Sequence, residues 1–146
     1  MTRKCEPQQQ IGSLRPLMVR STKENQVPTD FRDGKTFPRR GRQLMGPFMW
    51  LARVIDKARA SANGTIHDYI YPCPMDEGAF RRWGITSAEF DEAVGSNATD
   101  EEMLDWLQAR VRKGGVESAN RWISKKKENL DRQDLEEGVD PANSRR

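Results

Sequence analysis

The side chains best suited to chemistry are concentrated in residues 55–76, IDKARASANGTIHDYIYPCPMD. This stretch contains the only histidine of the chain, His67, together with both tyrosines and Cys73, which stands between two prolines. A cysteine and a histidine within hydrogen-bonding distance could form a thiolate nucleophile. Alternatively, Cys73 is a small, half-buried apolar side chain and His67 lies at the surface. The second interpretation is favoured because no third residue that would orient the pair is evident. The pattern therefore favours a protein that is not an enzyme.

The same stretch could instead bind a partner. Tyrosine is enriched at interfaces, and Tyr69 and Tyr71 are one residue apart, so they point to the same side of an extended segment. A small polar pocket beneath them would explain the charged residues before and after the loop. Alternatively, these charged residues cap a helix or pair on the surface, and at least one tyrosine packs in the core. The candidate binding residues are Asp56, Lys57, Tyr69, Tyr71, Cys73 and Asp76.

Other catalytic and cofactor-binding patterns are not found in the sequence. One histidine and one usable cysteine are too few ligands for a metal site, so we expect no metal. The chain has no glycine-rich phosphate loop, no Ser-His-Asp set and no paired catalytic carboxylates, and we expect no cofactor. The four tryptophans occur at helical spacing with other apolar residues, which indicates a core.

The net charge of +3 is unevenly distributed along the chain. Residues 1–45 carry ten Lys/Arg and four Asp/Glu, whereas residues 46–115 carry eight and eleven. A basic arm on a mildly acidic core could bind an acidic partner or phosphate, although charge can also simply solvate an arm. The candidates for nucleic-acid binding are Arg39, Arg40 and Arg42 in the cluster PRRGR, and the run Lys125, Lys126 and Lys127.

The first predicted helix leads into the candidate loop. Gly46-Pro47 should open it and Asn63-Gly64 should end it, with apolar residues recurring every three or four positions between them. Arg53, Lys57 and Arg59 lie off this apolar stripe. Residues 65–74 are expected to form an extended loop, because the two prolines exclude a helix through Cys73.

The remaining predicted helices are short and capped. Asp76 can cap a helix that ends at Gly84, and capping boxes begin at Thr86 and Thr99. Ser118 is the expected cap of the last helix. Short capped helices joined by glycine turns predict an all-α protein, a small orthogonal bundle of about five helices.

The apolar residues suggest three regions. All four tryptophans lie within residues 44–130, which we take as the helical domain. Residues 1–43 are expected to be an irregular basic arm, and residues 131–146 a flexible, frayed tail.

The sequence predicts a cytoplasmic location. The N-terminus, MTRKCEPQQQ, has no apolar segment of the kind found in secretory signals, and no run of about 18 apolar residues occurs that could span a membrane. The two cysteines, Cys5 and Cys73, do not make a disulfide framework. We therefore expect reduced thiols and a cytoplasmic protein.

Four segments together resemble a family of small bacterial helical proteins described only as a domain of unknown function. They are WLARVIDKARA, NGTIHDYIYPCPMD, FRRWGI and DEEMLDWL, and they lie between Phe37 and Ile123. In that family a helix similar to LPRLIDKARA leads to a tyrosine-rich loop, then to FLGI and an acidic capping box. The resemblance implies an all-helical fold and a cytosolic bacterial setting, and it implies no known activity, substrate or cofactor.

These features predict a small binding or adaptor module. The expected partner is another protein, bound through residues 69–76 and the basic arm. The alternative is a nucleic-acid- or ribosome-associated factor that uses the arm and residues 125–127. A third possibility is an enzyme with Cys73 as the nucleophile.

Overall fold

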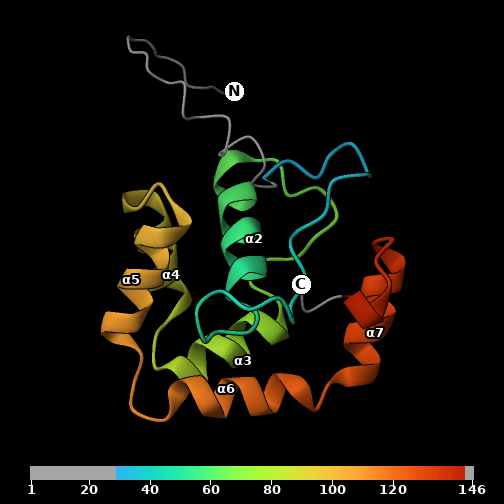
Figure 1. The fold of residues 1–146 in the computed structure, drawn as a ribbon. Coiled ribbons are helices and arrows are strands. Elements are labelled where there is room, and N and C mark those ends of the chain that lie inside the picture. The colour runs from blue at the N-terminus through green and yellow to red at the C-terminus, as the bar shows by residue number, and fades with distance from the viewer. Residues whose placement is uncertain (1–28, 144–146) are drawn as a thin grey trace, which may run out of the picture.

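The computed structural model describes residues 29–143, which contain six α-helices and one short 3-10 helix (Figure 1). No β-strand occurs in this part of the chain beyond one isolated bridge. The predicted all-α fold is therefore confirmed, with one helix more than the five expected. The helices are α2 (Leu51–Asn63), α3 (Pro74–Trp83), α4 (Ser87–Ser96), α5 (Asp100–Arg110), α6 (Gly115–Ser124) and α7 (Lys127–Glu136), followed by η1 (Pro141–Asn143).

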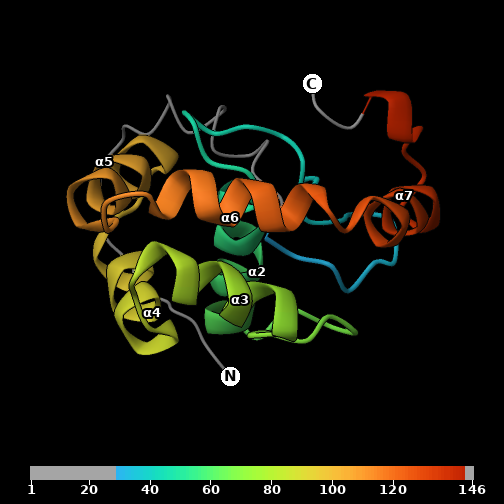
Figure 2. The same ribbon diagram turned by 90° about the horizontal axis from the view of Figure 1, so that it is seen from below.

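Helix α2 lies at the centre of the domain. In Figure 1 it has α4 and α5 on one side and α7 on the other, while α3 and α6 cross below it. Figure 2 shows that α3 and α6 lie side by side, and these two helices share the most extensive contact. No helix among residues 29–143 is both long and apolar enough to cross a bilayer. The largest core side chains are Trp50, Trp83, Phe48, Phe80 and Phe90.

Helix α2 begins four residues after the predicted start at Pro47. Met45 and Phe48 exchange two backbone hydrogen bonds of 3.0 Å, so Pro47 lies inside a tight turn. The Asn120 side chain of α6 donates to the Pro47 carbonyl at 2.8 Å and accepts the N–H of residue 49 at 3.1 Å. These contacts to α6 satisfy the backbone of the turn, which is why the chain does not continue as helix from Pro47.

Four helix ends lie where the sequence predicts them. Gly64 ends α2 and Gly84 ends α3, both in the left-handed conformation that glycine adopts without strain. Thr86 and Thr99 form the predicted capping boxes of α4 and α5. Local signals therefore determine these termini.

Helix α6 begins three residues before Ser118, its predicted cap. Its first residue, Gly115, lies against α3, where an added Cβ would be 2.7 Å from the Arg82 carbonyl oxygen. The preceding Gly114 has a φ of 77°. The two glycines therefore turn the chain into α6 at a point where α3 leaves no room for a side chain.

The structure differs from the predicted tail at residues 131–146. Helix α7 runs through Lys127–Glu136 and buries Leu130 and Asp134. Apart from Leu130 and Leu135 this helix has no apolar residue, and Leu135 is exposed. The helix is fixed to the domain by ion pairs, which an apolar pattern cannot reveal.

Residues 29–43 also belong to the fold rather than to a separate arm. Phe31 is only 1% exposed, its N–H donates to the Thr65 carbonyl at 2.9 Å, and its ring packs edge-on against Tyr69. The rest of the predicted arm, including Cys5, lies outside the described residues.

Candidate functional site

Both tyrosines of the loop between α2 and α3 bind the body of the domain. The Tyr69 hydroxyl donates to Glu137, just after α7, at 2.9 Å, and the Tyr71 hydroxyl donates to Asp91 of α4 at 2.6 Å. Burial, reinforced by these carboxylates, raises the pKa of both hydroxyls above the usual value. The hydroxyl groups of the two tyrosines are thus used within the domain, where they fix the loop.

The residue between the two tyrosines faces solvent. Ile70 is 70% exposed, the highest value among the large apolar side chains of the described residues. His67 and Asp68 precede it and are also exposed, with a His67 ring nitrogen 3.4 Å from the Asp68 carboxylate. His67 has a φ of 58°, a left-handed conformation that is uncommon for a residue with a Cβ. The loop therefore presents one large apolar side chain beside two polar ones.

Cys73 and Asp76 meet Lys57 at the start of α3. One Asp76 carboxylate oxygen accepts the Cys73 N–H at 2.9 Å and the Lys57 ammonium group at 2.8 Å, and the other accepts the Trp50 indole N–H at 2.8 Å. The Lys57 nitrogen also lies 3.3 Å from the Cys73 sulfur. Asp76 and Lys57 are both buried. Helix α3 begins at Pro74 with Cys73 as its N-cap, so Asp76 lies at the third position of the helix and not at its predicted start. There it completes the capping box and also neutralises a buried cation.

The structure does not bring the predicted Cys–His pair together. Among the described residues no hydrogen bond joins His67 to Cys73, and the polar neighbour of the thiol is Lys57. A nearby cation can stabilise a thiolate, but the Lys57 charge is already balanced by Asp76. Among the described residues, the Cys–His arrangement that the sequence suggested for a thiolate nucleophile is therefore not formed.

A second cation of α2, Arg53, binds Glu137 with both terminal nitrogens, at 3.0 and 2.7 Å. Its guanidinium group also lies 5.7 Å from the ring centres of Trp50 and Tyr69. A two-pronged arginine–carboxylate pair of this kind is strong and strictly oriented. Glu137 therefore connects the end of α7 both to α2 and to the tyrosine loop.

The third buried charge of α2 is Asp56, which accepts three hydrogen bonds from Arg39 at 2.8, 3.0 and 2.8 Å. Burial raises the pKa of Asp56 to about 6, against the opposing effect of Arg39. Arg39 also binds Asp100, which in turn pairs with Arg59 at 2.9 Å. Although burial opposes it, these two arginines lower the pKa of Asp100.

These contacts correct the expectation that Arg53 and Lys57 lie off the buried stripe of α2. Helix α2 is enclosed on almost every side up to Ala60, and Arg53, Asp56 and Lys57 are all buried. Each of the three pairs with a residue far away in the sequence. The signal that could have revealed this is the alternation of charged with apolar residues from Leu51 to Ala60, which leaves no wholly polar face for solvent.

The comparison with protein families matches most of this structure. A family model described as "Domain of unknown function (DUF5069)" matches residues 35–139. The chain belongs to this family. The match extends beyond residues 37–123, on which the resemblance rested, and includes α7 and Glu137. A comparison with curated proteins gives no match.

In the DUF5069 domain the predicted basic cluster is divided among internal contacts. Arg39 is bound by two carboxylates, and Arg42 pairs with Asp131 and Asp134 at 2.8 and 2.6 Å. Arg40 donates to a glutamine three residues later. These arginines fasten residues 39–42 to α2 and α7, and they do not form an open basic patch.

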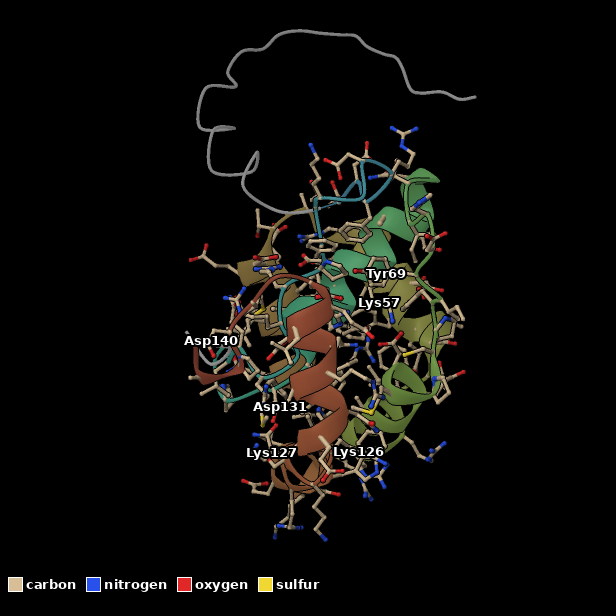
Figure 3. All side chains as sticks on the ribbon, turned by 90° about the vertical axis from the view of Figure 1, so that its right-hand side faces the viewer. Lys57, Tyr69, Lys126, Lys127, Asp131 and Asp140 are labelled. Atoms are coloured by element: carbon tan, nitrogen blue, oxygen red, sulfur yellow. The ribbon has the colours of Figure 1, made fainter. Side chains whose placement is uncertain are left out.

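The lysine run of the DUF5069 domain is divided as well. Lys127 pairs with Asp131 at 2.7 Å, and the Lys126 ammonium group lies 5.1 Å from the centre of the Trp122 ring. Lys125 is exposed. Figure 3 shows Lys126 and Lys127 at the start of α7, at the opposite end of that helix from Tyr69. The predicted nucleic-acid residues therefore do not share one surface.

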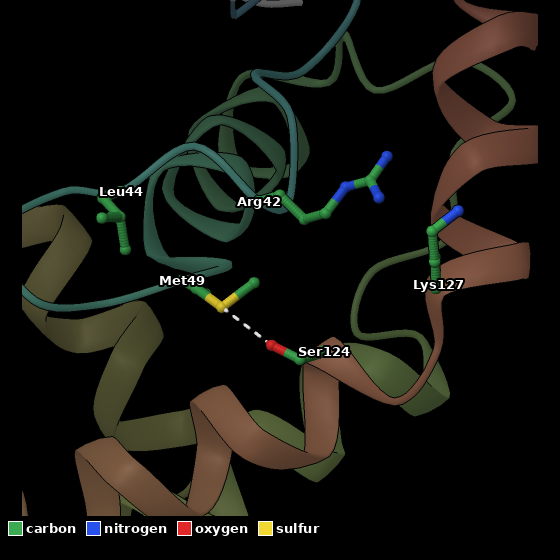
Figure 4. Close-up of a pocket in the computed structure, with 5 residues that line it drawn as sticks. All are labelled: Arg42, Leu44, Met49, Ser124 and Lys127. Carbon is green, nitrogen blue, oxygen red and sulfur yellow. Dashed lines mark hydrogen bonds between the residues drawn. The ribbon is translucent and has the colours of Figure 1, made fainter. Parts of the chain in front are cut away.

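A cavity of about 300 Å³ lies between the turn before α2 and the connection from α6 to α7 (Figure 4). Its two cations, Arg42 and Lys127, both pair with Asp131, so their charge is compensated. The cavity is lined by Arg42, Leu44, Met49, Ser124 and Lys127.

No group of three or more His, Cys, Asp or Glu side chains able to hold a metal ion occurs among residues 29–143.

Proposed function

We propose that this DUF5069 domain is a protein-binding module that recognises its partner with residues 66–72, and that Ile70 is the central contact. The observation that carries the proposal is the position of Ile70, which is 70% exposed although both neighbouring side chains are fastened to the domain. An isoleucine in this position adds little to the stability of the domain itself. Its apolar surface is available to a partner with an apolar pocket.

The rigidity of the loop supports this proposal. Tyr69 is fixed to Glu137, Tyr71 is fixed to Asp91, and the capping box at Cys73 fixes the end of the loop. A loop that is already ordered loses little conformational entropy on binding. In this proposal the buried ion pairs of α2 act as a support that positions the loop.

The expected contribution of Ile70 can be estimated from its exposed area. Full burial of an isoleucine side chain stabilises by about 1.5–3 kcal/mol. Because 70% of Ile70 is exposed, burial in a partner should contribute about 1–2 kcal/mol. That corresponds to roughly a 5- to 30-fold change in Kd.

The experiment places a photo-crosslinking amino acid at position 70 and, as a matched control, at position 135 of the full chain. Leu135 is 64% exposed and lies on α7. We expect a partner that is captured from position 70 and not from position 135. Its Kd should then weaken about 5-fold or more with Ile70→Asp and stay within twofold with Leu135→Asp. Equal capture from both positions, or equal affinity of both variants, would refute the proposal.

We further propose that the protein acts in the bacterial cytoplasm. Cys73 is a free thiol in contact with Lys57, which suits a reducing compartment. The resemblance to a bacterial cytosolic family supports the same setting. Fractionation of bacteria that express the tagged full chain tests this location, and recovery with the membrane or periplasmic fraction would contradict it.

A further inference from the structure

We propose that the domain also binds the phosphate backbone of nucleic acid, on a surface of which the sequence indicated only Lys125 and Lys126. The surface combines the last turn of α3, the connection between α5 and α6, and one flank of α6. It contains neither the tyrosine loop nor the arginines of residues 39–42. We define this basic surface as Arg81, Arg82, Arg112, Arg121, Lys125 and Lys126.

The charge of the basic surface is not compensated. Residues 110–126, which contain four of its six members, carry six Lys/Arg and one Asp/Glu, which is Glu117. Within the described part of the chain, no member of the basic surface forms an ion pair. The buried cations Arg42, Arg53 and Lys57 and the partly buried Arg39 all do. The domain therefore neutralises its internal cations and leaves these six free to attract phosphate.

Neutral groups hold the centre of the basic surface together. The Arg112 side chain donates from its Nε to the Arg82 carbonyl at 3.0 Å. The Arg82 guanidinium group lies 4.1 Å from the Trp122 ring centre and donates to the Gly78 carbonyl at 3.1 Å. Lys126 lies 5.1 Å from the same ring. Carbonyl groups and an indole ring orient these cations without cancelling their charge, which favours binding to an anion.

The exposed flank of α6 continues this surface. Because a helix turns about 100° per residue, Trp122, Lys125 and Arg121 follow one another around α6 on the side of Trp122. Trp122 packs against Gly78 of α3, so this is the side that faces α3. Figure 2 shows α3 beside α6. Lys125 and Arg121 are both exposed, so they extend the surface beyond Arg82.

Helix dipoles account for the position of these cations but do not neutralise their charge. Cations near the ends of α3 and α6 are stabilised by the partial negative charge there. Arg112 follows α5 and donates to the Arg82 carbonyl in the last turn of α3, so it too lies at a helix C-terminus. Glu77 and Glu117 stand one turn before Arg81 and Arg121, and they form no ion pair with them.

Nucleic acid fits this surface better than a membrane does. The large exposed apolar residues of the described chain are Leu44, Ile70 and Leu135, and none of them belongs to the basic surface. An interfacial membrane site would need apolar side chains that enter the bilayer. Four of the six members are arginines, whose planar fork matches phosphate oxygens.

The test uses the full chain and fluorescein-labelled 20-nucleotide single-stranded RNA and 20-base-pair DNA, followed by anisotropy from 50 to 200 mM KCl. The variant R121E/K125E reverses two exposed charges of the basic surface. The control K35E/R132E makes the same change in net charge at two exposed residues outside it. Loss of two phosphate contacts should weaken binding at 50 mM salt at least about tenfold and reduce the salt slope by about 2. The control should stay within about threefold.

The outcomes separate this proposal from its alternatives. Binding of either oligonucleotide that is lost in R121E/K125E and kept in K35E/R132E supports it. No binding at 50 mM KCl, or equal loss in both variants, overturns it. Binding to vesicles of phosphatidylserine and phosphatidylcholine without binding to the oligonucleotides also overturns it, in favour of a membrane surface. Ile70→Asp should leave oligonucleotide binding unchanged, so this proposal and the proposed protein contact can fail independently.

Discussion

Replacing Gly78 with alanine should destabilise the domain, although alanine is normally the better helix residue. Gly78 is an interior residue of α3, where helix propensity alone predicts a gain of about 1 kcal/mol. An added Cβ, however, would lie 2.1 Å from the tip of the Trp122 ring and 2.7 Å from two further ring atoms. Arg82 packs on the same ring at 4.1 Å, so the ring is held in its place.

The size of the effect follows from these distances. Ordinary contact between carbon atoms is about 3.5–4.0 Å, so the Trp122 ring would have to move by more than about 1 Å. Overpacking of this kind typically costs about 1–3 kcal/mol, and at 2.1 Å the upper end applies. After subtraction of the propensity gain we expect a net loss of about 1–2 kcal/mol. For a domain of this size that lowers Tm by about 4–10 °C.

Two further variants make the test decisive. Gly95 lies in α4, where an added Cβ would meet nothing within 4 Å, so Gly95→Ala should be neutral or stabilising by up to about 1 kcal/mol. Trp122→Phe removes the outer ring atoms that the Cβ added by Gly78→Ala would meet, so it should recover part of the loss in the double variant, with a coupling of about 1 kcal/mol. Urea unfolding measures the three single variants and the double variant. A Gly78→Ala protein as stable as Gly95→Ala, or strictly additive effects with Trp122→Phe, would refute the packing argument.

Three other predictions concern polar contacts within the domain. Asp76→Ala should lower the free energy of unfolding in urea by about 3–5 kcal/mol, and Lys57→Met should lower it clearly less. Without Lys57, the Asp76 carboxylate still accepts two N–H groups, whereas without Asp76 the Lys57 ammonium group keeps only the Cys73 thiol. A larger loss in Lys57→Met than in Asp76→Ala would contradict this. The Asp56 carboxyl carbon should titrate by NMR near pH 6. Since that pKa is higher in the folded than in the unfolded protein, the contribution of this group to stability is greatest below about pH 4 and is lost as the pH rises to about 6. A titration midpoint of Asp56 below pH 4 would show that the effect of Arg39 on the pKa is larger than that of burial. Tyr71→Phe should cost about 1 kcal/mol and speed hydrogen exchange in residues 66–72, and unchanged exchange would show that this hydroxyl does not fix the loop.

The parts of the fold that were predicted from the sequence are those determined by neighbouring residues. The predicted helix ends at Gly64 and Gly84 and the predicted helix starts at the two threonine capping boxes are confirmed. They could be predicted because a cap involves only residues three or four positions apart. The two prolines likewise excluded a helix through Cys73. The candidate loop was located for the same reason.

The parts that the sequence did not reveal depend on distant pairs. Arg53 and Lys57 look like surface residues until Glu137 and Asp76 are seen beside them. Helix α7 has almost no apolar residue, so nothing in its own pattern shows that Asp134 is buried against Arg42. Apolar periodicity reports burial only where burial is apolar. For a domain whose last helix is held by ion pairs, the apolar pattern of the sequence therefore ends before the folded domain does.

This difference leads to a last prediction, about where the domain ends. A chain that stops at residue 130, the predicted boundary, lacks Asp131, Asp134 and Glu137, and so leaves Arg42 and Arg53, both buried in the full chain, without the carboxylates that pair with them. Removing one partner of a buried pair costs about 3–5 kcal/mol, so two such losses approach the whole stability of a typical domain, about 5–15 kcal/mol. We therefore expect residues 1–130 to show no cooperative thermal unfolding by circular dichroism, whereas residues 1–139 should unfold as the full chain does. A cooperative transition of the 1–130 chain within a few degrees of the full-length Tm would mean that the ion pairs of α7 contribute little, and that the apolar core alone determines the fold.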